Sequence, residues 1–499
     1  MKNKILILII LAVSQSFLGC NDWLDVSPVT DIDLEDQIKS ADGFNEMLNG
    51  VYISLSDESL YGHHLMYGAL AQAAQNHVES SDLPITNFDY VSTNPKSIIK
   101  NVWNNLYNAI ANNNIILDNI DDNADLFLPD DYKLVKAEAI ALRAFIHFDA
   151  LRLFGDVYVD GTSEDPQIPY VTKYERLRFP HLPIADVYAK ILEDLDAAEA
   201  ILEEVDPIKG SYEGILFSAD ERKYHMNYYA VLALKARVYI TMKDNVNALL
   251  YAEKVINEYE WSWVSPDRLN GSDDEKDLLF MDELICALNV SKLNTYYNRY
   301  FGENSTQYHA ATTSDNYADL VFEKTIAPVR WWQSPTPGPG GNDWRYLHLM
   351  KIGGFGHRSI SIKYDQDVPI QKYFSDEGWV TLIQHRTVPL IRITELMLIA
   401  AEASLETDLD KAIQYVNSIK EKREVELTDI SGSVEDVLDA IVKELRKETY
   451  LEGQIFYMYK RLQLTSIPTM GTKYFRDVTP ENFIFPLPDN ELEFGNIQE

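Results

Sequence analysis

The sequence predicts a mainly α-helical fold: an irregular helical-repeat scaffold of the tetratricopeptide type that carries a large loop-rich insertion. Apolar and small residues recur at steps of three and four along several stretches, as they do on one face of a helix. Two segments, 239–251 and 403–415, share the order helix, short polar turn, helix. In each, an alanine (Ala248 or Ala412) lies three residues before a tyrosine, where such hairpins place a small residue so that two helices can pack closely. Chance likeness between two amphipathic hairpins is the alternative.

The start of the chain is typical of an export signal. A basic start precedes the apolar run from Ile5 to Val13, which is much shorter than the roughly 20 residues of a membrane-spanning helix. The ending Leu18-Gly19-Cys20 resembles the bacterial lipobox, whose cysteine thiol is acylated. We therefore expect a lipoprotein signal peptide at 1–19, a lipid such as palmitate on Cys20, and a lipid-anchored tether or lead-in at 20–40. Ordinary cleavage nearby, with Cys20 left as a thiol, is the alternative.

The composition is that of a globular protein with an acidic surface. Hydrophobic residues make up 46% of the 499 residues and aromatic residues 11%, which is enough to build a large core. The formal net charge is −34. Such a surface repels phosphates, and no run of Lys and Arg follows the signal, so we expect no nucleic acid ligand. A neutral or cationic ligand fits better. Cys286 is the only other cysteine, so a lipid on Cys20 excludes a disulfide within the chain.

Helical periodicity justifies the individual elements of the scaffold. Between 132 and 154, small and apolar residues step by four and three along one helix face: Ala137, Ala141, Ala144, Phe148 and Leu151. A second periodic helix follows over 187–202 and ends before Pro207. We expect a single domain over 41–499, with helical repeats at about 41–260 and 382–465 and the insertion at about 260–381.

The insertion differs from the scaffold in composition. Six of the eight tryptophans of the chain lie in it, at positions 261, 263, 331, 332, 344 and 379. The run from Ser334 to Gly341 is rich in proline and glycine and cannot form a helix or a strand. Because loops on a rigid scaffold concentrate ligand contacts, we expect the ligand to bind near this run.

Several motifs, taken in their order, resemble the SusD/RagB family of surface lipoproteins from Gram-negative bacteria. The likeness extends over almost the whole chain. Its motifs are Asp22-Trp23-Leu24-Asp25, Trp103 to Ile110, Leu142-Arg143-Ala144-Phe145, Leu153 to Val157, Pro389 to Leu396, Leu451-Glu452-Gly453, Lys460-Arg461 and Phe485 to Pro488. The resemblance implies a SusD-like fold and the capture of nutrients, mostly glycans, for a TonB-dependent SusC-like transporter.

Two positions of the closing helix depart from the family pattern. Gln454 stands where the family usually has an arginine, and Tyr457-Met458-Tyr459 replaces an aspartate before Lys-Arg. We therefore expect a charge pair of this helix to be missing, which concerns scaffold packing more than ligand binding. Asp343-x-Arg345 resembles a structural pair of the family, so we assign it, together with Trp344, to the fold.

Aromatic side chains beside amides and carboxylates are the pattern of a neutral glycan site. The first candidate site lies on both sides of the Pro/Gly run and comprises Trp331, Trp332, Gln333, Asn342 and Tyr346. Plain packing of the two adjacent tryptophans is the alternative.

Two further aromatic groups are candidates for ligand contacts, with a structural role as the alternative. The loop at 76–95 carries Phe88, Asp89 and Tyr90, and the resemblance implies that this region borders the ligand. Tyr296, Tyr297 and Tyr300 occur at helical spacing, which is more typical of a core or an interface than of a binding platform.

Motifs of catalysis and metal binding are missing or incomplete. The sequence contains no His-Glu-x-x-His, no Gly-x-Ser-x-Gly and no glycine-rich phosphate loop. His63-His64 lacks a third ligand at metal spacing, so a solvated or capping role is favoured over zinc. Asp121-x-Asn123-x-Asp125 opens like a calcium loop but continues with Leu126 where that loop needs glycine. We expect no catalytic residue and no cofactor, with a structural calcium ion left open.

These observations lead to one functional expectation and three rivals. We expect a protein that is not an enzyme, that binds an oligosaccharide or polysaccharide at the cell surface, and that delivers it to a SusC-like transporter in the outer membrane. A peptide-binding member of the same family, a surface glycoside hydrolase and a structural lid without ligand contacts are the alternatives. The sequence does not specify which glycan is bound.

Overall fold

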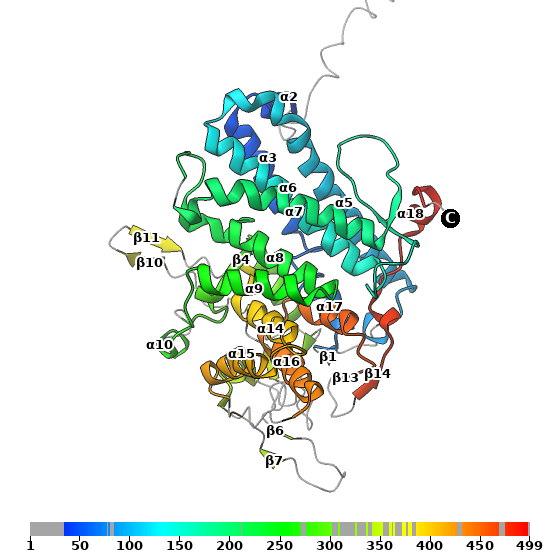
Figure 1. Cartoon of the computed structure of the whole chain (residues 1–499), viewed down its shortest axis with the longest axis vertical. Coiled ribbons are helices and arrows are strands. Elements are labelled where there is room, and N and C mark those ends of the chain that lie inside the picture. The colour runs from blue at the N-terminus through cyan, green and yellow to red at the C-terminus, as the bar shows by residue number, and fades with distance from the viewer. Residues whose placement is uncertain are drawn as a thin grey trace, which may run out of the picture.

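Helices form most of the part of the chain that the computed structural model describes. That part is residues 34–497, with gaps at 77, 80–83, 211, 271–275, 302–307, 310–324, 327–335, 338–341, 353–358, 362, 365–371, 376–377, 382–385, 426, 428–431 and 469–474. The predicted mainly α-helical class is confirmed, since the strands of these ranges form only short two-stranded pairs. In Figure 1 the N-terminal helices (blue to cyan) lie at the top, the middle helices (green) below them, and the yellow to orange helices at the bottom.

The N-terminal half supplies two long helices and several shorter ones. The side chain of Ser40 caps the helix at Ala41–Leu55 by accepting a hydrogen bond from the Gly43 amide at 3.1 Å. The five small and apolar residues predicted to share one face of the helix at 132–154 are all buried, and neighbouring helices pack against them. The helices are α2 (Leu34–Gln37), α3 (Ala41–Leu55), α4 (Ala69–Ala73), α5 (Thr93–Asn119), α6 (Pro129–Phe154) and α7 (Ile184–Val205).

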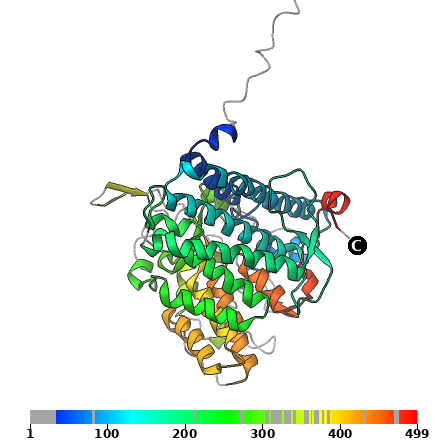
Figure 2. The same cartoon turned by 45° about the horizontal axis from the view of Figure 1, so that its top comes forward.

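The two predicted hairpins form, and both are built in the same way. Asp244 and Asp408 each cap the second helix of their hairpin by accepting a hydrogen bond from the backbone amide three residues later, at 3.1 Å. Ala248 and Ala412 are fully buried where the helices meet. The helices are α8 (Tyr228–Thr241), α9 (Asn245–Glu258), α14 (Ile393–Ala403) and α15 (Leu409–Lys422), and α9 packs on α14, so the two hairpins are neighbours (Figures 1 and 2).

Three further helices close the chain. Ser433 and Asp436 form a reciprocal capping box at the start of the first of them. The second turns back into the scaffold and contacts the N-terminal helices, so the end of the chain completes the core. These helices are α16 (Val434–Glu448), α17 (Gln454–Arg461) and α18 (Asp489–Phe494).

The insertion leaves and re-enters the scaffold through one antiparallel ladder. Strand β4 (Leu284–Asn289) pairs with β12 (Thr387–Arg392), with Thr387 opposite Asn289 and Arg392 opposite Leu284. Both strands are almost wholly buried, so the two ends of the intervening segment are fixed side by side in the core. Between them lie α11 (Leu293–Phe301) and α13 (Trp344–Leu349), while α10 (Pro266–Leu269) precedes β4.

Short strand pairs and 3-10 turns connect these elements. The pairs are β1 (Val78–Glu79) with β5 (Tyr308–His309), β2 (Pro166–Pro169) with β3 (His181–Pro183), β6 (Thr325–Ile326) with β7 (Thr336–Pro337), β8 (Met350–Ile352) with β9 (Ser359–Ser361), β10 (Lys372–Ser375) with β11 (Gly378–Thr381), and β13 (Ser466–Pro468) with β14 (Phe475–Asp477). The 3-10 turns are η1 (Ile85–Asn87), η2 (Asp121–Leu126), η3 (Pro207–Lys209), η4 (Ala219–Tyr224), η5 (Met281–Glu283) and η8 (Pro480–Phe483).

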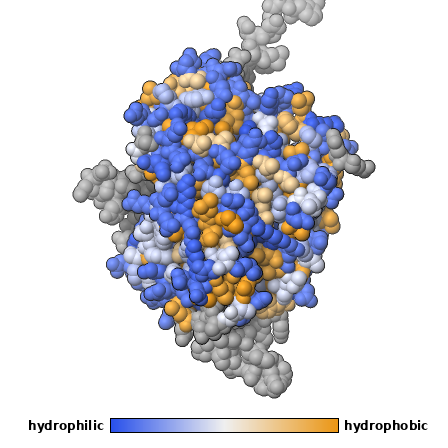
Figure 3. Space-filling view, in the orientation of Figure 1, coloured by the Kyte–Doolittle hydropathy of each residue, from blue (hydrophilic) through white to orange (hydrophobic). Residues whose placement is uncertain are grey.

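One continuous hydrophobic core runs from α3 to the C-terminal segment. On the face shown in Figure 3, hydrophobic residues gather in small patches surrounded by hydrophilic ones, as is normal for a protein surface. Within the described ranges, none of the helices has an apolar stretch long enough to cross a membrane. Cys286 of β4 is a buried free thiol.

Candidate ligand-binding site

An aromatic cluster joins the scaffold to the insertion at the segment between α3 and α4. His63 of this segment stacks face to face on Tyr300 of α11, with ring centroids 3.9 Å apart and planes 6° from parallel. Tyr67 meets the rings of Tyr297 and Phe301 edge-on, at centroid distances of 5.8 and 6.0 Å. We call these five residues the α11 aromatic cluster. It forms because residues three and four apart share one side of α11.

A polar rim borders the α11 aromatic cluster. Arg299 Nη1 donates to Glu58 Oε1 at 2.5 Å, and Tyr300 Oη donates to the same oxygen at 3.1 Å. The Arg299 side chain is 48% exposed and that of Glu58 28%, while Tyr300 is half-buried. A ring, a carboxylate and a guanidinium are therefore offered to solvent at one place. The ring suits the C–H face of a sugar, the carboxylate accepts from its hydroxyl groups, and the guanidinium donates to them.

Burial sets the protonation of the rings in and beside this cluster. Burial, followed by the charge of Glu58, raises the pKa of Tyr300 to about 12, so its hydroxyl keeps its proton at neutral pH. Burial lowers the pKa of the neighbouring His64 to about 4, although Glu58 and Asp57 pull it upward. Both rings are therefore neutral at pH 7, and the charges around them come from the Arg299–Glu58 pair and from Asp57.

The three tyrosines of α11 differ in their surroundings. Tyr296 and Tyr297 are 8% and 1% exposed, as the prediction of a core or interface role requires. Tyr300 is different because its ring reaches the polar rim. His63 is fully buried in the stack, so of the two roles predicted for it, solvated or capping, the solvated one is wrong. No local pattern indicates the pairing of His63 with Tyr300, since the two residues belong to distant segments.

The loop around η1 is tied to the C-terminal part of the chain. Tyr90 is buried, and its hydroxyl donates to the Asn482 carbonyl at 2.5 Å. Asp89 accepts from the Val91 and Ser92 amides, both at 3.1 Å, and the Ser92 hydroxyl holds the pKa of Asp89 below its usual value. These contacts give Asp89 and Tyr90 internal partners.

Phe88 of this loop is half-exposed, as Asp89 is. It adopts a left-handed backbone conformation with φ 58°, and the Arg476 guanidinium lies 4.6 Å from its ring centroid. A ligand role for Phe88, Asp89 and Tyr90 stays a prediction.

The first candidate site falls largely outside the described residues. Trp331, Trp332 and Gln333 lie there. Asn342 is exposed just before α13, and Tyr346 is half-buried within it. Their role as ligand contacts stays a prediction.

A buried network of charges fixes α13 to the scaffold. Arg345 donates to Asp343 at 2.9 and 2.6 Å and to Glu448 of α16 at 2.9 Å. Arg423, at the end of α15, bridges Glu448 and Glu283 of η5. All five side chains are at most 3% exposed. We call them the buried charge network; they hold the flank of the first candidate site in place, which agrees with the structural role assigned to Asp343 and Arg345.

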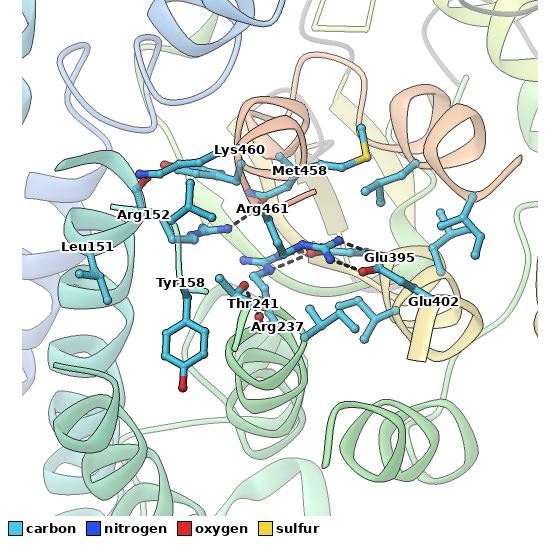
Figure 4. A pocket seen from close by; sticks show the side chains of 18 of the residues that line it. Leu151, Arg152, Tyr158, Arg237, Thr241, Glu395, Glu402, Met458, Lys460 and Arg461 are labelled. Atoms are coloured by element: carbon cyan, nitrogen blue, oxygen red, sulfur yellow. Dashed lines mark hydrogen bonds and ion pairs between the residues drawn. The ribbon is translucent and has the colours of Figure 1, made fainter. Parts of the chain in front are cut away.

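A narrow cavity lies where α6, α8, α14, α16 and α17 meet (Figure 4). Figure 4 shows two ion pairs in its wall, Arg237 with Glu395 and Arg461 with Glu402. Its volume is about 50 Å³, which holds only a few water molecules at roughly 10–15 Å³ each. A sugar unit does not fit there, so these ion pairs are scaffold contacts.

Gln454 and Tyr457, two residues of the closing helix that depart from the family pattern, line the same cavity and contact Arg152 there. The Arg152 side chain of α6 donates to Gln454 Oε1 at 3.1 Å, and its guanidinium lies 3.7 Å from the ring centroid of Tyr457. Lys460 Nζ donates to the Arg152 and Gly155 carbonyls at 2.7 and 2.5 Å, which caps the C-terminal end of α6. The residues that depart from the family pattern therefore hold α17 on α6 through Arg152.

The described part of the chain brings no three His, Cys, Asp or Glu side chains together as metal ligands. The sequence that opens like a calcium loop lies in η2, where Asp121 accepts from Lys136 Nζ at 2.6 Å and from the Tyr132 hydroxyl at 2.8 Å. Asp121 is thus engaged by a lysine and a tyrosine of α6.

Comparison with known proteins places the chain and its fold in a defined class. A family model described as starch-binding and associating with the outer membrane matches residues 22–240. A second model, of the SusD family, matches residues 346–492. Two SusD-like proteins of Formosa agariphila are each 24% identical to the chain, over 98% and 97% of its length and over 97% and 94% of theirs.

Solved structures show the same fold. A SusD superfamily protein from Bacteroides thetaiotaomicron is 21% identical, with a TM-score of 0.66 over 92% of this chain and 99% of that one. A putative sugar-binding protein from Bacteroides vulgatus is 20% identical, with a TM-score of 0.68 over 92% and 98%. The chain is thus of a class of mainly α-helical proteins that share this helical-repeat fold. It belongs to the SusD family, as the motifs of the sequence predicted.

Proposed function

We propose that this chain is a non-catalytic, lipid-anchored protein of the outer membrane that captures an oligosaccharide or polysaccharide and delivers it to a TonB-dependent SusC-like transporter. The family supports this role, because one matching model is described as starch-binding and a similar structure from Bacteroides vulgatus is of a SusD-like carbohydrate-binding protein. The lipid is carried by Cys20, which lies outside the described residues.

The α11 aromatic cluster is the observation that carries the proposal. Its Tyr300 ring, the Glu58 carboxylate and the Arg299 guanidinium reach solvent together. The insertion supplies α11, and the first candidate site belongs to the same segment. Trp331 and Trp332 lie outside the described residues, and a contact of their rings with the glycan is part of the proposal.

The charge of the chain favours a peptide as the second candidate ligand. A net charge of −34 attracts a cationic peptide. Binding of such a peptide weakens strongly as salt rises from low to physiological concentration, whereas binding of a neutral glycan changes little.

Glycan and peptide arrays probed with the full-length chain in detergent test the function. We expect a neutral glycan among the hits, and Tyr300→Ala to weaken its binding at least tenfold, which is about 1.4 kcal/mol. Tyr174→Ala is the matched control, because Tyr174 is 57% exposed outside the cluster. Trp331→Ala/Trp332→Ala tests the first candidate site. Hits that are all cationic peptides would favour the peptide ligand, and no hit at all would favour a structural lid.

The anchor and the transporter need their own measurements. Metabolic labelling with a palmitate analogue should mark the chain and fail to mark Cys20→Ser. Protease treatment of intact cells should remove the domain, whereas full protection would contradict exposure at the cell surface. Co-purification with the SusC-like transporter should survive Tyr300→Ala, because the ligand site and the anchor are separate features of the chain.

A further inference from the structure

A second and larger cavity lies where α9 ends. It is bounded by η3 and η4 on one side and by the start of α8 and the end of α9 on the other. Its volume is about 470 Å³, within the range of roughly 300–1,000 Å³ that is usual for small-molecule sites. None of the residues that line it belongs to the α11 aromatic cluster. We call it the α9-end cavity.

Two tyrosine rings form the apolar base of the α9-end cavity. Tyr229 and Tyr259 lie with ring centroids 5.2 Å apart at an angle of 53°. The Tyr229 hydroxyl donates to the Glu258 carbonyl at 3.1 Å and the Tyr259 hydroxyl to the Leu284 carbonyl at 2.8 Å. Because both hydroxyls are engaged, the rings are fixed; they are 6% and 8% exposed, so each turns a small part of its carbon surface to the cavity. Ile208 adds an aliphatic side.

Three charged groups surround this base. Glu258 and Glu260 are exposed, and neither carboxylate makes a hydrogen bond or an ion pair with another residue of the described ranges. Lys223 Nζ donates once, to the Met281 carbonyl at 2.8 Å, which leaves two of its three N–H groups for a ligand.

The position of the two carboxylates is unfavourable for the helix itself. Glu258 is the last residue of α9 and Glu260 follows it closely, while no basic residue occupies the last turn. Negative charge at the C-terminal end of a helix opposes the helix dipole. These carboxylates therefore do not serve the stability of α9, and a role toward a ligand accounts for them.

The mixture of groups selects the kind of ligand. An anion would face two carboxylates, and a simple cation would face Lys223. A neutral molecule with several hydroxyl groups can donate to Glu258 and Glu260, accept from Lys223, and place its C–H groups against the exposed part of the two tyrosines and Ile208. We propose that the α9-end cavity binds a neutral saccharide unit, as a second site apart from the α11 aromatic cluster. This proposal rests on the saccharide-binding function proposed above.

Ligand-observed NMR on the full-length chain tests the second site. The probes are the methyl glycosides of glucose, galactose, mannose, xylose and N-acetylglucosamine, with glucosamine as a cationic probe. The variants are Glu258→Ala/Glu260→Ala, Tyr300→Ala, and the control pair Glu46→Ala/Glu406→Ala, which removes the same charge from exposed positions outside the cavity. All substituted carboxylates are exposed, so circular dichroism should show an unchanged fold.

We expect at least one neutral glycoside to bind in a way that Tyr300→Ala leaves intact. Glu258→Ala/Glu260→Ala should weaken that binding at least tenfold, and the control pair should not change it. If no probe depends on Glu258 and Glu260, the second site is refuted whatever happens at Tyr300. If glucosamine alone depends on them, the neutral ligand class is refuted. Loss of all binding in Tyr300→Ala would leave the proposed function intact and remove the second site.

Discussion

Replacing Arg423 by methionine should destabilise the protein more than any other single change at a charged residue of the buried charge network. Arg423 donates to Glu283 at 2.9 and 2.5 Å and to Glu448 at 2.8 and 3.0 Å. Its guanidinium is fully buried, as are both carboxylates it binds. It connects the end of α15 to η5 before the insertion and to the end of α16.

The expected loss follows from what remains after the substitution. Glu448 keeps Arg345 at 2.9 Å and the Thr394 hydroxyl at 2.8 Å, whereas Glu283 keeps, among the described residues, the Val264 amide at 3.0 Å. Glu283 thus becomes a buried carboxylate without a hydrogen-bonded cation among the described residues. Leaving such a charge uncompensated costs about 3–5 kcal/mol, so we expect the free energy of unfolding to fall by about that amount.

Denaturant unfolding of the full-length chain measures this loss. In Arg423→Met/Glu283→Leu both charges are absent, so this double variant should recover most of the stability, and the cycle should show strong coupling. Lys443→Met is the surface control, because Lys443 and its partner Asp439 are 43% and 62% exposed, and it should cost at most about 1 kcal/mol. A loss below about 1 kcal/mol for Arg423→Met, or a double variant as unstable as the sum of the two single ones, would refute the reasoning.

Three further predictions concern titration and reactivity. Burial alone would raise the pKa of Glu444, but Arg345 and Lys447 lower it to about 2. The contribution of the Glu444 carboxylate to the free energy of unfolding should therefore be complete above about pH 4.5 and be lost as the pH falls toward 2. Acid unfolding should show a smaller loss of this free energy in Glu444→Gln. Burial lowers the pKa of Lys460 to about 7, so above that pH the unfolded chain binds more protons than the folded chain. The free energy of unfolding should therefore rise between pH 7 and 9. An equal rise of this free energy with pH in Lys460→Met would contradict this. Burial raises the pKa of Cys286 to about 12, so a thiol reagent at pH 8 should label Cys20→Ser only after unfolding, and rapid labelling of the native chain would show that Cys286 is accessible.

Local patterns in the sequence were sufficient to predict the helical scaffold. The spacing of Ala248 before Tyr251 and of Ala412 before Tyr415 depends only on neighbours along the chain, and both hairpins form as that spacing indicates. The helix α6 shows the limit of such patterns. Its predicted face is buried, but so is most of its remaining surface, because helices from both halves of the chain surround it. Only the assembled fold determines this.

The candidate site could not be predicted in the same way because its groups come from distant segments. Tyr300 was assigned to a core or interface from its helical spacing, and nothing near it in sequence indicates the stack with His63 or the contact with Glu58. The pairing of Arg423 with Glu283 is equally remote along the chain. The role of such residues depends on contacts between distant segments, and neither the composition nor the periodicity of a sequence indicates these contacts.

The ladder between β4 and β12 has a consequence for how ligand preference can change. Because the ladder brings both ends of the intervening segment together inside the core, closing a longer or shorter segment there changes the entropy of the chain only slightly, by about 0.6 kcal/mol for each doubling of length. The helical repeats would tolerate such exchanges as long as Glu283, Arg345 and their partners are kept. Apart from Asp343 and Arg345, which belong to the buried charge network, the segment between the two strands can therefore be treated as an interchangeable cassette, and transplanting it between relatives should transfer ligand preference without rebuilding the scaffold.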